Sequence, residues 1–104
     1  MKRNAFTMKL KKGFEEEYKK RHDEIWPTLQ TYLSEQGILD YVIYLEESTS
    51  TLFAVQKLAD DFVAENIPNH PIVQKWWAYM ADIMETNADN SPVVHPLKEV
   101  FFMA

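Results

Sequence analysis

The sequence predicts an α+β domain in which strands and helices follow one another in the order β, helix, β, β, helix, β. Two observations lead to this prediction. Apolar residues recur at helical spacing in some stretches and alternate, or mix with aromatic and β-branched residues, in others. Turn-forming residues separate these stretches. The order is that of the ferredoxin-like split βαβ fold, an antiparallel sheet with helices on one face.

Length and composition restrict the class of protein. The 104 residues have the usual size of one compact domain, so residues 1–104 are expected to form a single domain. With 46% hydrophobic residues the chain can build a core, and the lack of cysteine excludes disulfides and thiolate chemistry. The net charge of −5 argues against binding to nucleic acid or an anionic membrane, which needs a basic face. No apolar run has the length of a membrane span or of a signal-peptide core, so we expect a soluble cytoplasmic protein.

The first part of the chain predicts one strand and two helical segments. Residues 1–10 form the strand, because apolar side chains alternate at its end and indicate one buried face. A helix follows from about Gly13 towards Arg21, with glutamates in its first turns, where they suit the helix dipole. Pro27 should kink or end this helix, because it lacks a backbone donor. A second helical segment covers residues 28–36.

The middle of the chain predicts a hairpin. Residues 41–45 are rich in aromatic and β-branched side chains and form a strand, and residues 51–58 return as the next strand after a polar loop. Because side chains alternate along a strand, Leu52, Ala54 and Gln56 share one face of the second strand. The same rule places Tyr41 and Tyr44 on opposite faces of the first strand, so at most one of them faces the helices.

The last part predicts a short helix, a longer helix and a final strand. Residues 62–67 form the short helix, and Pro71 opens the longer one with Asn69 or His70 as its cap. This longer helix has a wide apolar face that includes Trp76 and Trp77. Residues 87–92 form a loop dense in turn formers, and residues 99–103 form the last strand.

The predicted sheet has consequences for assembly. Helices that cover one side leave the other side bare, and an apolar surface of several hundred Å² is rarely exposed on a monomer. Two copies that pack sheet to sheet would cover it. We therefore expect a homodimer.

The chemistry is expected around Tyr18 and His22. These residues are four apart and share one face of the first helix, on a stripe that is otherwise apolar. A helix end beside a histidine and a tyrosine suits a pocket. The spacing alone favours a core histidine with one satisfied hydrogen bond, because most buried polar groups are structural. Asp23 and Glu24 could orient the imidazole, although a solvated position suits them better.

Trp76 and Trp77 are the second candidate feature. Neighbouring residues on a helix point about 100° apart, so one indole can pack while the other edges a cleft. Indole faces stack well on the apolar faces of sugar rings, although core packing explains such a pair equally well. Three scattered histidines have no metal-ligand spacing, and there is no glycine-rich phosphate loop or nucleophile elbow.

Together these features resemble the L-rhamnose mutarotases, a family of dimeric α+β-barrel proteins. The resemblance spans nearly the whole chain and is specific as a set. Its matching pieces are Tyr18, Arg21-His22, Ile25-Trp26-Pro27, Tyr41, Ile43-Tyr44-Leu45, Trp76-Trp77-Ala78-Tyr79-Met80, Asp89-Asn90-Ser91-Pro92 and Glu99-Val100-Phe101.

The resemblance implies an isomerase that interconverts the α and β anomers of L-rhamnose. It implies that His22 is the proton donor and that Tyr18, Tyr41, Trp76 and Trp77 bind the sugar. It implies no cofactor and no metal. The same barrel also hosts cofactor-free monooxygenases and haem-binding proteins, in which His22 would serve oxygen chemistry or bind iron. A non-catalytic sugar-sensing module is a further alternative.

Overall fold

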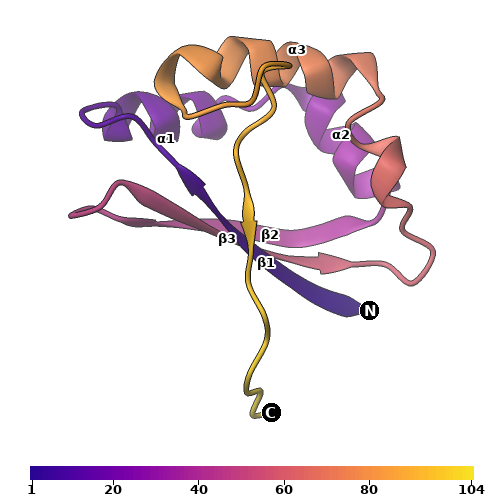
Figure 1. The fold of residues 1–104 in the computed structure, drawn as a ribbon. Coiled ribbons are helices and arrows are strands. Elements are labelled where there is room, and N and C mark those ends of the chain that lie inside the picture. Colours follow the sequence, from indigo (N-terminus) through magenta and orange to yellow (C-terminus); the bar gives the residue numbers. More distant parts are fainter.

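A computed structural model describes residues 1–104, and it has a four-stranded antiparallel sheet with all helices on one face (Figure 1). The strands are β1 (Lys2–Lys9), β2 (Ile38–Glu46), β3 (Thr51–Leu58) and β4 (His95–Pro96). The helices are α1 (Glu15–Asp23), α2 (Pro27–Glu35) and α3 (Pro71–Met80), with 3₁₀ turns η1 (Ala64–Asn66) and η2 (Ala81–Ile83). None of the helices is both long and apolar enough to span a membrane.

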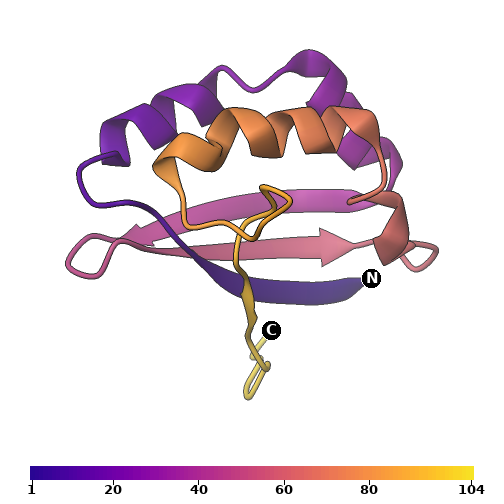
Figure 2. The same cartoon turned by 45° about the horizontal axis from the view of Figure 1, so that its top comes forward.

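The sheet has the strand order β2-β3-β1-β4, which is that of the split βαβ fold. Figure 2 shows the three α-helices together above this sheet, as the sequence predicts. The register places Ala54 of β3 between Phe6 of β1 and Ile43 of β2, and all three side chains face the helices. The predicted fold class and the predicted face of β3 are therefore confirmed.

Local signals set most of the helix ends. α1 ends at Asp23 and α2 begins at Pro27, which confirms that the proline separates two helices. The backbone N–H of Ile72 donates to the Nδ1 atom of His70 at 3.1 Å, so His70 is the cap of α3. The predicted short helix over residues 62–67 is reduced to the single 3₁₀ turn η1.

The core lies between the sheet and the helix layer. It consists of residues from β1, β3, all three helices and η2, which together exclude water from one face of the sheet. The buried members are Met8, Leu10, Tyr18, Leu29, Leu52, Ala54, Val73, Trp76, Met80, Ile83 and Met84.

The last predicted strand is wrong. Residues 99–103 form no strand, and the last strand is instead the two-residue β4 before them, with Phe6 opposite Pro96 and Thr7 opposite His95. The outer edge of β1 pairs with β4 over two residues only, because the chain crosses this edge and continues past the sheet (Figure 1). Beyond that point the segment has no neighbouring strand with which to form a ladder.

The face of the sheet opposite the helices is apolar and exposed. Phe53 and Val55 of β3 are each 37% exposed, and Tyr44 of β2 is 62% exposed. The C-terminal tail also leaves the body on this side (Figure 1). It is held at Arg3, whose Nε atom donates to Glu99 at 2.6 Å and whose guanidinium lies 3.9 Å from the ring centre of Phe102.

Candidate functional site

Tyr18 and His22 stack on each other along α1. Their ring centres are 4.2 Å apart with an angle of 27° between the planes, as the spacing of four residues on a helix allows. Tyr18 is buried and His22 is half-buried. Asp23 and Glu24 are both exposed, in agreement with the solvated position that the sequence favours for them.

A backbone carbonyl orients His22 instead. Its Nδ1 atom lies 3.1 Å from the carbonyl oxygen of Tyr18. A carbonyl oxygen only accepts, so Nδ1 carries the hydrogen and donates it. The neutral imidazole therefore has its free lone pair on Nε2, which makes no hydrogen bond within the protein.

Burial keeps this imidazole neutral. It lowers the pKa of His22 below the ordinary value, and this effect exceeds the opposing effects of the Tyr18 carbonyl and of the Asp23 carboxylate. At neutral pH His22 is therefore a base at Nε2 rather than a cation.

Trp76 connects His22 to α3. The edge of the Trp76 indole meets the His22 ring with centres 5.3 Å apart and planes at 85°. On its other side Trp76 meets Trp26 at 5.1 Å, again edge to face, and Tyr79 at 5.7 Å. Trp76 is 9% exposed, whereas Trp77 is half-buried and packs on the core from outside. The two indoles thus differ in burial, in agreement with their different directions on the helix.

Tyr41 approaches the same region from the sheet. Tyr44 points to the exposed face, and Tyr41, three residues earlier and 41% exposed, is on the opposite face by alternation. The register of β2 shifts between Leu39 and Val42, where Asp40 has φ = +48°. Burial raises the pKa of the Tyr41 phenol to about 12. Burial raises the pKa of Tyr18 as well, and the nearby Tyr41 phenol adds to this rise. Both phenols therefore keep their protons at neutral pH.

The structure thus joins Tyr18, His22 and Trp76 through ring contacts and places Tyr41 near Tyr18, while Trp77 makes none of these ring contacts. Sequence reasoning missed the group that joins α1 to α3. The guanidinium of Arg21 donates to Asp82 at 2.8 Å, to the Tyr79 carbonyl oxygen at 2.7 Å and to Glu17 at 2.7 Å. Only the Glu17 contact was visible in the sequence, as a pair four residues apart on one helix.

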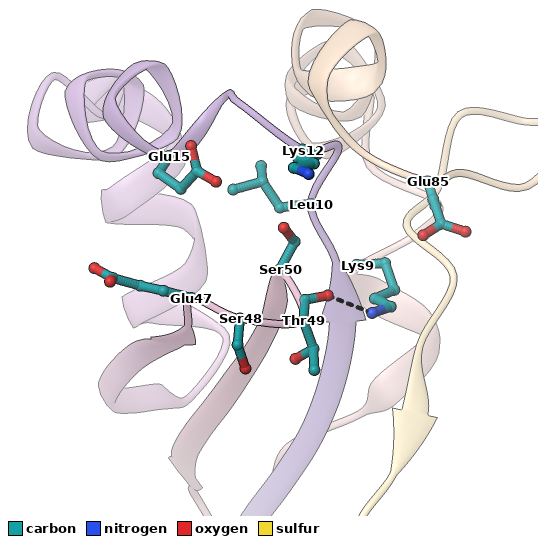
Figure 3. Close-up of a pocket in the computed structure, with 9 residues that line it drawn as sticks. All are labelled: Lys9, Leu10, Lys12, Glu15, Glu47, Ser48, Thr49, Ser50 and Glu85. Carbon is teal, nitrogen blue, oxygen red and sulfur yellow. Dashed lines mark hydrogen bonds between the residues drawn. The ribbon is translucent and has the colours of Figure 1, made fainter.

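A separate polar hollow of about 290 Å³ lies at the β2–β3 hairpin (Figure 3). The Lys9 ammonium donates there to the Thr49 carbonyl oxygen at 2.5 Å. Its lining contains none of the aromatic or histidine candidates; it consists of Lys9, Leu10, Lys12, Glu15, Glu47, Ser48, Thr49, Ser50 and Glu85. The hollow is therefore distinct from the cluster around His22.

The fold and this cluster define a ferredoxin-like α+β protein in which a neutral imidazole and protonated phenols meet aromatic rings between sheet and helices. Such a combination suits proton transfer on a small polar ring compound. The family model for L-rhamnose mutarotase matches residues 3–103. The chain therefore belongs to the L-rhamnose mutarotase family.

Individual relatives agree over the full length. The chain is 59% identical to an L-rhamnose mutarotase of Flavobacterium johnsoniae, over 97% of this chain and 94% of that protein. It is 57% identical to one of Phocaeicola vulgatus, over 99% of both chains. The crystal structure of L-rhamnose mutarotase FA22100 from Formosa agariphila superimposes with a TM-score of 0.93 at 50% identity, over 100% of both chains.

Proposed function

We propose that this protein is an L-rhamnose mutarotase, an isomerase of the aldose 1-epimerase type that acts in cytoplasmic rhamnose metabolism. Family membership supports the substrate. The observation that carries the chemistry is the state of His22, whose Nδ1 hydrogen is held by the Tyr18 carbonyl and whose Nε2 lone pair is free. This family match also favours the mutarotase over the oxygen and haem chemistry of other dimeric α+β barrels.

The reaction needs only proton transfers. Nε2 of His22 takes the proton of the anomeric hydroxyl, and the electron pair of that O–H bond forms the C=O bond of the aldehyde. The bond from C1 to the ring oxygen breaks, and the ring oxygen receives a proton from the imidazolium. Both oxygens are attached to C1, so one nitrogen can serve them in turn. Rotation about C1–C2 and the reverse steps close the ring as the other anomer.

The other candidates bind the sugar in this proposal. The phenols of Tyr18 and Tyr41 remain protonated and can donate to sugar hydroxyls. Trp76 and Trp77 offer indole faces to the apolar side of the ring, including the methyl group at C6. No redox step or group transfer occurs, so these side chains suffice for the scheme.

The test is the rate of L-rhamnose anomer exchange, measured by saturation-transfer NMR. Wild type should exceed the solvent rate, and His22→Ala should lose about 10² to 10⁴ of the enzymatic rate, the usual contribution of a general acid–base group. His95→Ala is the control, because His95 is exposed on β4. Rates are corrected for the folded fraction by circular dichroism.

Two results would contradict the proposal. A folded His22→Ala variant with an unchanged exchange rate would remove His22 from the chemistry. A wild-type protein that binds rhamnose and leaves exchange at the solvent rate would be a sugar-sensing module.

We further propose that two copies form a homodimer through the exposed face of the sheet. Val55, Phe53 and Tyr44 supply apolar surface there, and the tail adds Phe101, which is 78% exposed. Sedimentation velocity should show a dimer at micromolar concentration. Val55→Arg, which places a charge at the centre of this face, should shift the protein to monomer, and a wild-type monomer would refute the interface.

A further inference from the structure

We propose that Asn4 and Gln56 form an amide pair that binds one hydroxyl of the sugar at the sheet side of the site. This inference rests on the proposed function and assigns a specificity-determining contact to it. The Nδ2 atom of Asn4 donates to Oε1 of Gln56 at 3.0 Å, across the β1–β3 ladder in which the two residues are direct partners.

The pair is exceptional on its face of the sheet. The inward positions that follow along the ladder are apolar, with Phe6 opposite Ala54 and Met8 opposite Leu52. Gln56, at 6% exposure, is the only buried residue with an amide or charged side chain. An amide at such a position lowers stability unless its hydrogen-bonding groups are satisfied, so the partners of each of its groups decide what it can do.

Each amide has one group left over. Gln56 uses Oε1 and Asn4 uses Nδ2, while Nε2 of Gln56 and Oδ1 of Asn4 make no hydrogen bond within the protein. No side-chain nitrogen or oxygen in the structure is both fully buried and unpartnered, so these two atoms are open to solvent or to a ligand. If the nitrogen and oxygen atoms of both amides are exchanged, the pair still has one free NH₂ group and one free carbonyl oxygen.

The pair lies next to the cluster around His22. The register of β2 shifts between Leu39, opposite Lys57, and Val42, opposite Val55, so Asp40 and Tyr41 together lie opposite the single residue Gln56 of β3. Gln56 is buried and Tyr41 is 41% exposed, and the Tyr41 phenol is close enough to Tyr18 to raise the pKa of that phenol. Tyr41 therefore lies between the amide pair on the sheet and the Tyr18–His22 stack on α1.

The chemistry of the pair matches a hydroxyl. A sugar hydroxyl donates one hydrogen bond and accepts others, and the free NH₂ and carbonyl groups supply both roles. The neighbouring protonated phenols cannot accept as strongly from a hydroxyl as an amide oxygen can. The alternative is a structural pair, whose only role is the hydrogen bond between its two residues. That alternative predicts lost stability after substitution and unchanged affinity.

The experiment compares Gln56→Met with wild type by NMR titration and exchange kinetics. Methionine keeps the length and burial of the side chain and removes the amide. The half-saturating L-rhamnose concentration should rise about fivefold to tenfold, the usual effect of one lost hydrogen bond, while the rate at saturation changes little because His22 is intact. The monodeoxy analogue of rhamnose that lacks the bound hydroxyl should bind wild type more weakly than rhamnose does, by a similar factor. Gln56→Met should not weaken the binding of this analogue further.

The chain contains a matched control. Nδ2 of Asn66 donates to Oε1 of Gln36 at 3.1 Å, the same bond between the same residue types, away from the site between η1 and the end of α2. Gln36→Met should leave affinity unchanged. Asn4→Leu, at a half-buried position, should reproduce the loss of affinity if Gln56→Met does not fold.

The inference is overturned if a folded Gln56→Met or Asn4→Leu variant saturates at the wild-type concentration. It is also overturned if no monodeoxy analogue shows the expected coupling. Failure of the proposed function is a separate result, because it shows as wild-type exchange at the solvent rate. In that case the titrations, which measure binding and not exchange, still test the role of the amide pair. If the wild-type protein binds no sugar at all, both the inference and the proposed function are overturned.

Discussion

Replacing Trp76 by alanine should destabilise the fold by about 3 to 5 kcal/mol, the usual range for a buried aromatic side chain. Trp76 is 9% exposed and forms edge-to-face pairs with His22 and Trp26. An indole buries about 150–250 Å², which at about 25 cal/mol per Å² corresponds to a burial free energy of roughly 4–6 kcal/mol. The methyl group of alanine retains a small part of this free energy. The free energy of unfolding of domains of this size is about 5–15 kcal/mol, so the variant loses a large part of its stability.

Thermal unfolding followed by circular dichroism measures the loss. A change of 1 kcal/mol shifts the Tm of a domain of this size by about 4 °C or more, so Trp76→Ala should melt at least about 12 °C below wild type. Trp77→Ala is the matched control on the same helix. Trp77 is half-buried and belongs to none of the aromatic ring pairs, so its removal should lower the Tm by about half as much or less.

Trp76→Phe separates the effect on the fold from the effect on the site, because it keeps an aromatic ring in the core but makes a smaller contact with His22. We expect this variant to be folded and to exchange rhamnose anomers more slowly than wild type. Equal Tm values for Trp76→Ala and wild type would refute the packing of α3 described above. A larger loss for Trp77→Ala than for Trp76→Ala would show that the two indoles have been assigned the wrong faces.

Two further predictions concern pH and backbone conformation. Because burial lowers the pKa of His22, the exchange rate should stay high as the pH falls to the ordinary value of 6.5 and should decline only below it, and a decline that begins above 6.5 would contradict this. The unfolded chain protonates His22 at a higher pH than the folded chain does. The free energy of unfolding should therefore decrease as the pH falls from 6.5 through the folded pKa of His22. Gly37 and Gly13 have φ values of +95° and +93°, and a Cβ would lie 2.8 Å from the Ala59 Cβ at Gly37 but near nothing at Gly13. Urea unfolding should therefore show a loss of about 1 kcal/mol for Gly13→Ala from strain alone, and a loss larger by about 1–3 kcal/mol for Gly37→Ala; equal losses would refute the clash.

The sequence alone determined the features that depend on neighbours along the chain. The stacking of Tyr18 on His22 follows from the helical period, and the break between α1 and α2 follows from the missing N–H of Pro27. The strand order follows from the succession of elements, because few arrangements of a hairpin and two crossovers are possible.

Only the tertiary structure decided which distant residues meet. The pairing of Asn4 with Gln56, the contact of Arg21 with Asp82 and the approach of Trp76 to His22 each join separate elements. The burial that lowers the pKa of His22 has the same origin. The predicted strand over residues 99–103 was wrong for the same reason, since a β-prone segment forms a strand only where a free sheet edge runs alongside it. Such contacts depend on how helices pack over a sheet, and the packing of several elements is not encoded in the spacing of residues within any one of them.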